Sequence, residues 1–261
     1  LWEEVDGNNL TIDEATLTVG NPDVSSFSFT MGRLPVPFGA FETNMVTDPM
    51  TLDLGETKET VAMVGFEAGS FSASVYVFNG DLDKAGNNDE NIGADLRLSM
   101  NGIDLGVSWI NDIGDSDGLT DAITAAGHTR NVGGIAAHVQ INSGDFNLIA
   151  EYIAATDNFS SGALEYNGSG AQPKAWNIEA GYTFKNGIAG RETTLALGHQ
   201  RTSESQAIGL PMKRTSATVS VALFKNAGLS VEWMHDEDYS AANGGTGDNA
   251  DTVTAQLAFE F

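Results

Sequence analysis

The sequence predicts an all-β fold, an antiparallel transmembrane β-barrel of about 14 strands (range about 12 to 16), and three observations support this prediction. Segments of about ten residues alternate apolar and polar side chains. No apolar run approaches the roughly 18 to 20 residues that a membrane-spanning helix requires. The links between the segments are alternately short and long. Tilted strands of about 9 to 11 residues cross a bilayer with one apolar face, so a hydropathy scan would not reveal such a barrel.

The alternation is clearest in the last segment, residues 252–261. One face carries Val253, Ala255, Leu257, Phe259 and Phe261, and the other carries Thr254, Gln256, Ala258 and Glu260. A period of two is expected where one face of a strand meets lipid and the other meets water. The same pattern recurs in residues 94–100, 103–109, 176–184 and 217–223. Each range predicts a membrane-crossing strand, and residues 252–261 predict the strand that closes the barrel.

The links between segments favour a membrane barrel over a soluble β-sandwich or β-helix, the alternative fold. Tight links occur at Gly69-Ser70, Asn101-Gly102, Ser143-Gly144 and Asn226-Ala227-Gly228, and longer polar loops at 39–59, 80–91, 111–130, 157–173, 203–212 and 236–251. Short periplasmic turns and long extracellular loops are typical of outer-membrane barrels. Aromatic residues near segment ends predict interfacial girdles. These residues are Trp109, Trp176, Tyr182, Phe184, Trp233, Phe259 and Phe261.

The strand count follows by working back from Phe261. This gives about thirteen strands plus a stub at Leu1–Glu4, and bacterial barrels have an even number. The stub reads as the end of a strand, followed by the turn-forming residues 6–9. We therefore expect residues 1–261 to form a single barrel domain that begins partway into a longer precursor.

The charge balance restricts the partners. The chain has 36 Asp and Glu against 12 Lys and Arg, a formal net charge of −24, and no Cys. Such acidity argues against nucleic-acid binding, which depends on basic surfaces. In a barrel it predicts acidic loops and an acidic lumen that favours cations. The expected partners are outer-membrane lipid, lipopolysaccharide and a small-molecule solute; the sequence does not specify an oligomeric state or call for a cofactor.

Charged residues on the polar faces are candidates for lining the pore. If the apolar faces meet lipid, the opposite faces line the lumen, because a charge at mid-membrane on the lipid side costs about 2 to 4 kcal/mol for Arg or Lys. The pore-lining or substrate-binding candidates are Arg33, Glu42, Asn44, Asp48, Glu67, Asp95, Arg97, Glu151, Glu179, Arg214 and Glu232. The alternative is that such charges only pair with one another and keep the wall satisfied.

Residues 39–59 differ from the other long loops. Pro35 and Pro37 lack a ladder donor, so the preceding strand must end near Leu34. The stretch that follows mixes polar residues with Met45, Val46, Met50, Leu52 and Leu54. An exposed loop seldom carries so many apolar side chains. The sequence therefore predicts a loop that folds into the barrel mouth and narrows the pore; an ordinary extracellular loop is the alternative.

The first part of the chain also resembles a known family. Residues Asp13-Glu14-Ala15, Val19-Gly20-Asn21-Pro22, Met31-Gly32-Arg33, Pro37-Phe38-Gly39, Phe41-Glu42-Thr43-Asn44-Met45, Asp48-Pro49-Met50-Thr51-Leu52, Leu54-Gly55-Glu56-Thr57 and Val75-Tyr76-Val77-Phe78-Asn79-Gly80-Asp81 carry the resemblance. Together they are similar to the legiobactin-receptor family of siderophore porins. The resemblance is best over residues 1–110 and implies an outer-membrane channel that takes up ferric siderophores without a plug domain.

Catalysis and metal binding find little support. The four His residues lack the spacing of a metal site, and there is no Gly-x-Ser-x-Gly motif. Oxygen-rich loops at Asp81, Asp83 and Asp89 and at residues 112–118 have some of the spacing of a Ca²⁺ site, but neither completes a calcium-binding loop. We expect a channel, either for ferric chelates or as a general cation-preferring porin. A structural barrel that acts as scaffold or sheath for a partner is the alternative of another class.

Overall fold

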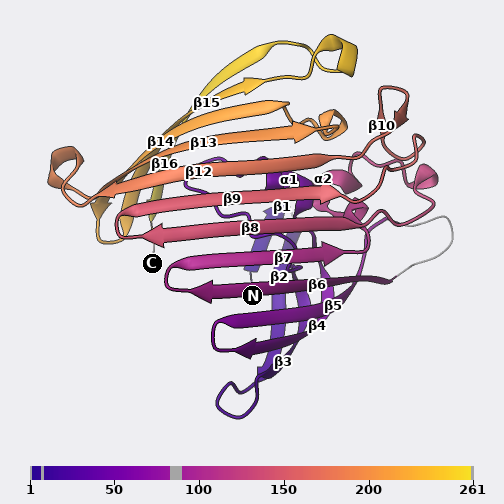
Figure 1. The fold of residues 1–261 in the computed structure, drawn as a ribbon, viewed down its shortest axis with the longest axis horizontal. Coiled ribbons are helices and arrows are strands. Elements are labelled where there is room, and N and C mark those ends of the chain that lie inside the picture. Colours follow the sequence, from indigo (N-terminus) through magenta and orange to yellow (C-terminus); the bar gives the residue numbers. More distant parts are fainter. Residues whose placement is uncertain (1, 7–8, 83–89, 260–261) are drawn as a thin grey trace.

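The computed structural model describes residues 2–6, 9–82 and 90–259, and side chains from residue 13 onward. Fourteen strands form one sheet in which each strand pairs with its neighbour along the chain, and a separate two-stranded hairpin lies between the ninth and tenth of them. The pairings between successive strands are antiparallel (Figure 1). The predicted count of about 14 strands is confirmed.

The sheet is built from β1 (Trp2–Asp6), β2 (Asn9–Gly20), β3 (Phe27–Pro35), β4 (Lys58–Ala68), β5 (Phe71–Asn79), β6 (Glu90–Met100), β7 (Ile103–Ile110), β8 (Gly134–Ser143), β9 (Phe146–Ala155), β12 (Lys174–Phe184), β13 (Thr193–Ser203), β14 (Lys213–Phe224), β15 (Ala227–Glu237) and β16 (Asn249–Phe259). The hairpin is β10 (Glu165–Tyr166) with β11 (Ser169–Gly170). The helices are α1 (Met50–Gly55) and α2 (Asp117–Thr120), with 3-10 turns η1 (Ile113–Asp115), η2 (Ala125–Gly127), η3 (Ile188–Gly190), η4 (Gln206–Ile208) and η5 (Ala241–Asn243).

The links alternate in length as the sequence predicts. Two-residue turns join β4 to β5, β6 to β7, β8 to β9 and β14 to β15, and the links with α1, α2 and the hairpin lie at the other end of the strands (Figure 1). Two links at the same end as the turns are longer, 21–26 between β2 and β3 and 185–192 between β12 and β13. At the β6–β7 turn Asn101 and Gly102 both have positive φ, 53° and 79°. This is the backbone that a two-residue Asn-Gly hairpin requires. We call the two ends the short-turn end and the long-loop end.

The terminal strands differ slightly from the expectation. The predicted stub forms β1 and pairs with β2. β16 is described as far as Phe259, so the aromatic terminus predicted at Phe261 lies outside the described residues, as does Leu1. The sheet curls so that its first strands lie behind the central ones (Figure 1). Among the described residues the pairings leave β1 and β16 as the two edges of the sheet.

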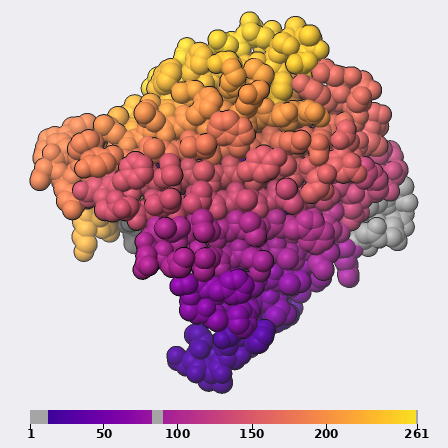
Figure 2. Space-filling model, viewed as in Figure 1, coloured from indigo at the N-terminus to yellow at the C-terminus, as the bar shows by residue number. Residues whose placement is uncertain are grey.

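The outer face of the wall carries apolar side chains and the inner face carries polar ones, the opposite of the arrangement in a soluble β-sandwich. Along β13, Leu195 and Leu197 are exposed, whereas Gly198 and Gln200 are buried. The same alternation runs along β7, with apolar side chains outside and Ser108 inside. Figure 2 shows this outer surface as continuous over the central strands. No helix in the described parts of the chain is long and apolar enough to cross a membrane. An apolar exterior over a polar interior is what the period of two predicted.

The long-loop end contains a packed core inside the wall. Side chains from the link between β3 and β4, from α2 and from the two links flanking β8 and β9 meet inward residues of the strands. Among the buried members are Phe38, Leu54, Tyr76, Ile113, Leu119, Ile153, Phe159 and Leu164. This core fixes the long loops against one side of the interior, because burying these side chains removes their apolar surface from water.

Candidate functional site

The link between β3 and β4, residues 36–57, runs along the inner face of the sheet; we call it the inner segment. β3 ends at Pro35, where the first of two prolines interrupts the ladder, and β4 begins at Lys58. The link is therefore three residues longer at its start than the predicted 39–59, and two shorter at its end. Only α1 within it is helical among the described elements. Most of its backbone donors must therefore find partners outside regular structure.

Glu151 of β9 provides the first anchor. Its Oε1 accepts from the amide of Ala40 at 2.6 Å, and both of its oxygens lie 3.3 Å from the amide of Phe41. The Thr51 hydroxyl, at the start of α1, donates to Oε2 at 2.7 Å. One carboxylate thus holds two separate parts of the inner segment.

Glu179 of β12 provides the second anchor. Its Oε2 accepts from the amide of Asn44 at 2.6 Å, and its Oε1 accepts from the Thr43 hydroxyl at 2.7 Å. The Asn177 side chain, two residues away on the same face, donates to Oε1 at 3.0 Å. The carboxylate is fully buried, with 0% of the residue exposed.

Glu232 of β15 provides the third anchor. Its Oε2 accepts from the amides of Val46 and Thr47, the second at 3.2 Å. Between the second and third anchors, Gln200 of β13 accepts from the amide of Met50 at 2.7 Å. The sulfur of Met45 accepts from the Thr218 hydroxyl of β14 at 2.9 Å. The inner segment is thus bonded to each strand from β12 to β15, and to β9.

The three anchors share one physical logic. Each carboxylate is at most 5% exposed, and burying an ionised carboxylate is costly unless it is hydrogen-bonded. Each irregular stretch of the inner segment carries amides that are costly to bury unpaired. Charge-assisted bonds to backbone amides pair the amides with both oxygens of Glu151 and with Oε2 of Glu179 and of Glu232, and such bonds are stronger than neutral ones, although the buried Oε1 of Glu232 has no hydrogen-bond partner among the described residues. The anchors therefore fix the path of the inner segment across several strands.

The start of the inner segment is held by another part of the wall, the strands β6 and β7. The Gly39 amide donates to Ser108 of β7 at 3.0 Å, and the Gly39 carbonyl accepts from Arg97 of β6 at 3.0 Å. Phe38, 1% exposed, packs in the core. Gly55, at the end of α1, lies so close to Ile153 that a Cβ atom there would fall 2.6 Å from its Cδ1. Polar bonds and packing together leave little freedom at either end.

The inner segment presents acids where it is not anchored. Glu42 and Asp48 are exposed, whereas Asn44 is half-buried and donates to Asn147 of β9 at 2.9 Å. Both carboxylates are therefore open to solvent, while the segment that carries them is bonded to the inner face of the wall.

The structure places the other candidate residues in three settings. Asp95 pairs with Arg97 at 3.0 Å, and Arg214 makes a two-pronged pair with Asp236 at 2.9 and 3.0 Å, as the alternative of mutually paired wall charges predicts. Glu67 is exposed on the inward side of β4 near the short-turn end. Arg33 shares the exposed face of β3 with Phe29 and Met31, opposite the buried Thr30. The structure thus separates Arg33 from the other candidates.

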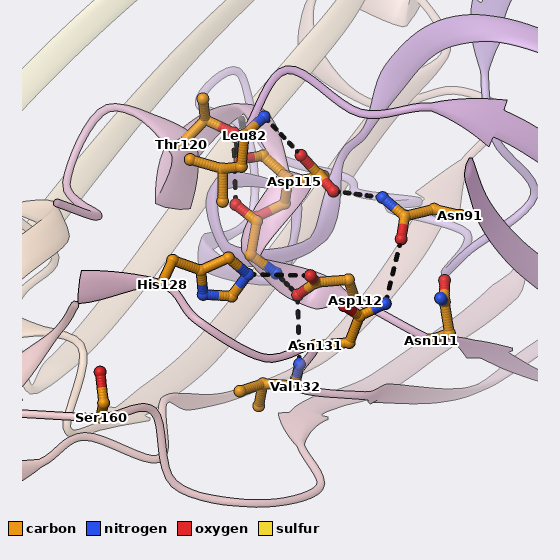
Figure 3. A network of polar contacts seen from close by, with 12 residues as sticks. Leu82, Asn91, Asn111, Asp112, Asp115, Thr120, His128, Asn131, Val132 and Ser160 are labelled. Carbon is orange, nitrogen blue, oxygen red and sulfur yellow. Dashed lines mark hydrogen bonds and ion pairs between the residues drawn. The ribbon is translucent and has the colours of Figure 1, made fainter. Parts of the chain in front are cut away.

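A second polar network lies among the long loops (Figure 3). Asp112 accepts from the amides of Gly114 and Val132, and its other oxygen lies 2.8 Å from Nε2 of the buried His128. Asp115 accepts from the Asn91 side chain and from the Leu82 amide. These bonds tie the two loops flanking β6 and β7 together. Asp112 and Asp115, which lie in the oxygen-rich stretch 112–118, thus hydrogen-bond to groups of the protein itself.

In the first oxygen-rich loop, the candidate Ca²⁺ ligands Asp83 and Asp89 lie outside the described residues, whereas Asp81 is described. Among the described residues, no group of three or more His, Asp or Glu side chains is placed to hold a metal ion.

An acidic cavity lies between α1 and α2. It has a volume of about 330 Å³ and is lined by Leu52, Asp53, Glu56, Asp117, Gly118, Ile208 and Leu210. Burial is the largest cause that raises the pKa of Asp53, Glu56 and Asp117, and repulsion from a nearby carboxylate adds to it: Asp48 for Asp53, Asp117 for Glu56 and Asp81 for Asp117. These carboxyls therefore bind protons more readily than exposed ones.

Sequence reasoning missed Gln200 and His128 as fixed points of the interior. Gln200 had a readable signal, because it shares the inward face of β13 with Gly198 in an alternating strand. His128 had none, since its partner Asp112 lies 16 residues away in an irregular loop.

Comparisons with known proteins show relatives and a fold. No family model matches the chain. It is 29% identical to a UPF0422 protein of Legionella pneumophila strain Lens, covering 98% of this chain and 55% of that protein. It is 27% identical to a UPF0422 protein of Coxiella burnetii, covering 98% of this chain and 57% of that protein. The chain thus spans about half the length of the curated relatives it matches.

The solved structures that it resembles are porins. An anion-selective porin from Comamonas acidovorans aligns with a TM-score of 0.69 at 14% identity, covering 99% of this chain and 82% of that one. OmpF of Salmonella typhi, in complex with daunomycin, aligns with a TM-score of 0.63 at 14% identity, covering 96% and 79%. OprB of Pseudomonas putida has a TM-score of 0.59 at 10% identity, covering 98% and 74%. The predicted antiparallel barrel fold is thereby confirmed.

Proposed function

We propose that this protein is a channel of a Gram-negative outer membrane that passes small solutes, and that it is not an enzyme. The observation that carries the proposal is the inner segment, held against the inside of a porin-like wall by Glu151, Glu179 and Glu232. A loop that is bonded to a wall across several strands narrows the enclosed space and keeps a fixed shape there. The apolar outer face supports contact with outer-membrane lipid.

The exposed charge of the inner segment supports a preference for cations. Glu42 and Asp48 are exposed on it, and the whole chain carries a formal charge of −24. Rings or rows of carboxylates at a constriction favour cations over anions. This preference would distinguish the protein from the anion-selective porin whose fold it shares.

For the cargo we favour ferric siderophores, with a general cation-preferring porin as the alternative. The stretches 41–45 and 48–52, which resemble siderophore porins, are also the stretches that Glu151, Glu179 and Gln200 anchor, and Glu232 holds residues 46–47 between them. The residues that carry the resemblance therefore build the constriction, where a channel discriminates between solutes. A scaffold or sheath for a partner remains the alternative of another class, supported by the packed core at the long-loop end.

Single-channel recording in planar bilayers tests the proposal. We expect discrete current steps, a reversal potential that favours cations, and current blocked by a ferric siderophore but not by its iron-free form. Current without block selects the general porin, and absence of current from folded protein selects the scaffold. Neutralising Glu42→Gln and Asp48→Asn should reduce cation preference, whereas the matched pair Asp157→Asn and Glu165→Gln in an exposed long loop should not.

Removing residues 41–56 tests the constriction directly. The deletion takes away the anchored stretch, so the conductance should rise because the enclosed space widens. A deletion variant that folds and conducts at the level of the intact chain would refute the constriction.

A further inference from the structure

The outward face of β12, β13 and β14 has an unusual charge distribution. The outward positions are those that alternate with the buried Ala175, Ala196 and Ser216. They carry no Asp or Glu on any of the three strands, in a chain with three acids for every base. The charges on this face are Lys174, Arg201 and Lys213, and all three lie at the long-loop end.

The three cations are neighbours. Arg201 and Lys213 are direct cross-strand partners, and Lys174 opposes Ser203, which places it diagonally from Arg201. Side chains in direct and diagonal positions lie about 5 and 7 to 8 Å apart at their bases, within reach of one ligand. We call these three residues the cationic row.

Two of the three charges have no carboxylate partner. Lys213 pairs with Glu237 of β15 at 2.8 Å, with side chains 33% and 41% exposed, and such exposed pairs contribute little. Lys174 and Arg201 form no ion pair within the described chain. Lys174 and Arg201 therefore keep positive charges on the outward face that the described chain leaves unpaired, and Lys213 shares its charge with Glu237.

An apolar groove lies directly beside the cationic row, toward the middle of the strands. It has a volume of about 340 Å³ and is lined by Ala137, Val139, Ala150, Tyr152, Trp176 and Ile178, together with His138, Glu151 and Asn177, which alternate with them along the strands. Trp176 is the cross-strand partner of Arg201, so the groove begins where the cationic row ends. The small Ala137 and Ala150 between larger side chains leave the space. A second outer groove, near Phe71 and Leu105, has no such outward cations beside it.

We propose that the cationic row and the groove beside Trp176 bind one lipopolysaccharide molecule, with its phosphates on the row and an acyl chain in the groove. The proposal rests on the proposed outer-membrane function, in which the long-loop end faces the outer leaflet. Phosphate is an acceptor that Arg engages with two parallel bonds and Lys as a point charge. The acyl chain packs favourably against the apolar groove. The aromatic rings of Tyr152 and Trp176 suit the boundary between the apolar groove and the cationic row.

The test measures binding of purified lipopolysaccharide that lacks O-chain to the detergent-solubilised chain, by native mass spectrometry and titration. Near a membrane surface each basic residue contributes about fivefold in affinity toward anionic lipid. The triple variant Lys174→Gln, Arg201→Gln, Lys213→Gln should therefore bind on the order of 100-fold more weakly. The matched triple Lys185→Gln, Arg191→Gln, Lys225→Gln makes the same charge change at the short-turn end and should change affinity less than twofold.

Two further arms separate the phosphate from the lipid. Dephosphorylated lipopolysaccharide should bind the parent chain as weakly as the intact lipid binds the cationic-row triple, and millimolar inorganic phosphate should not compete. Ala150→Phe, which fills the groove, should lower affinity while leaving the cationic row intact. Equal losses in both triples, or undiminished binding of the dephosphorylated lipid, would overturn the proposal.

Conductance measurements distinguish failure of the lipid-site proposal from failure of the proposed channel function. The cationic-row triple should conduct normally in phosphatidylcholine bilayers, because the row faces away from the lumen. A conducting channel without lipopolysaccharide binding would overturn the lipid site alone. Lipopolysaccharide binding without conductance would overturn the channel alone.

Discussion

Replacing Glu179 with Gln should release the middle of the inner segment. The two carboxylate oxygens serve different donors, Oε2 the Asn44 amide and Oε1 the Thr43 hydroxyl. An amide side chain keeps one acceptor oxygen and turns an NH₂ group toward the other donor. The variant therefore loses one charge-assisted bond and weakens the other to a neutral one. With charge-assisted bonds at about 1.5 to 3 kcal/mol and neutral ones at about 1, the loss is about 2 to 5 kcal/mol.

The absence of cysteine makes this loss measurable. Met45, 9% exposed, lies next to Asn44 and packs on Thr218, so a Met45→Cys background carries one shielded thiol at the anchored stretch. If reaction with a thiol reagent requires detachment, its rate scales with the detached fraction. A loss of about 2 kcal/mol already predicts labelling about 30-fold faster in Glu179→Gln.

The matched control is Glu42→Gln in the same background. It removes the same charge from the same segment, but Glu42 is exposed and makes no hydrogen bond in the described structure. Its labelling rate should stay within about twofold of the parent, since surface substitutions usually shift stability by less than about 0.5 kcal/mol. Equal rates in the two variants would refute the view that a buried carboxylate, and not net charge, holds the inner segment.

Three further predictions concern the wall, the long-loop network and pH. Leu197→Lys places a charge mid-strand on the exposed face and should lower folding stability in bilayers by about 2 to 4 kcal/mol. Ser220→Lys on the inward face should lower folding stability less, and equal losses would contradict the assigned faces. Asp112→Asn removes the carboxylate that contacts the buried His128 and should lower the local stability of residues 111–133 by about 3 kcal/mol, which is measured as faster amide exchange. The exposed Asp121→Asn should leave exchange unchanged. Burial raises the pKa of Glu56 above its ordinary 4.5, so the contact between α1 and α2 should be most stable below that value and weaken as pH rises through the raised pKa. Amide exchange in residues 50–57, corrected for intrinsic rates, should show this dependence, and Glu56→Gln should reduce it; an unchanged slope in the variant would contradict the assignment.

The wall of this protein could be predicted because its signals are local. Whether a residue faces lipid or the interior depends on its parity within one strand, and the Asn101-Gly102 turn carries its own backbone preference. A strand such as β13 needs no knowledge of its partners for its two faces to be told apart. The same holds for the inward Glu151, Glu179 and Glu232, which parity alone assigns to the interior.

Arg33 is the candidate residue whose position within its strand places its side chain outside the lumen. Its strand alternates in the ordinary way, with Phe29 and Met31 on the exposed face, so the same counting that identified Glu179 places Arg33 outside. The prediction that Arg33 lines the lumen treats it as a residue of a polar face, and it also belongs to the motif Met31-Gly32-Arg33. A motif reports which residues occur together, whereas the direction of a side chain on a strand follows from its position.

The partners of the anchoring carboxylates could not be read from the sequence, for a physical reason. The bonds of Glu151, Glu179 and Glu232 go to backbone amides 110, 135 and 185 positions away, and a backbone amide has no sequence signature. A row of inward acids therefore reads equally as a solute-binding surface or as a set of anchors. The structure shows that these three carboxylates hold the inner segment and leaves Glu42 and Asp48 as its exposed acids. Discrimination between solutes should then depend on Glu42 and Asp48 through their charge, and on the three buried glutamates through the shape that they impose. Neutralising the exposed pair should change selectivity at constant conductance, while neutralising an anchor should change conductance and its noise together.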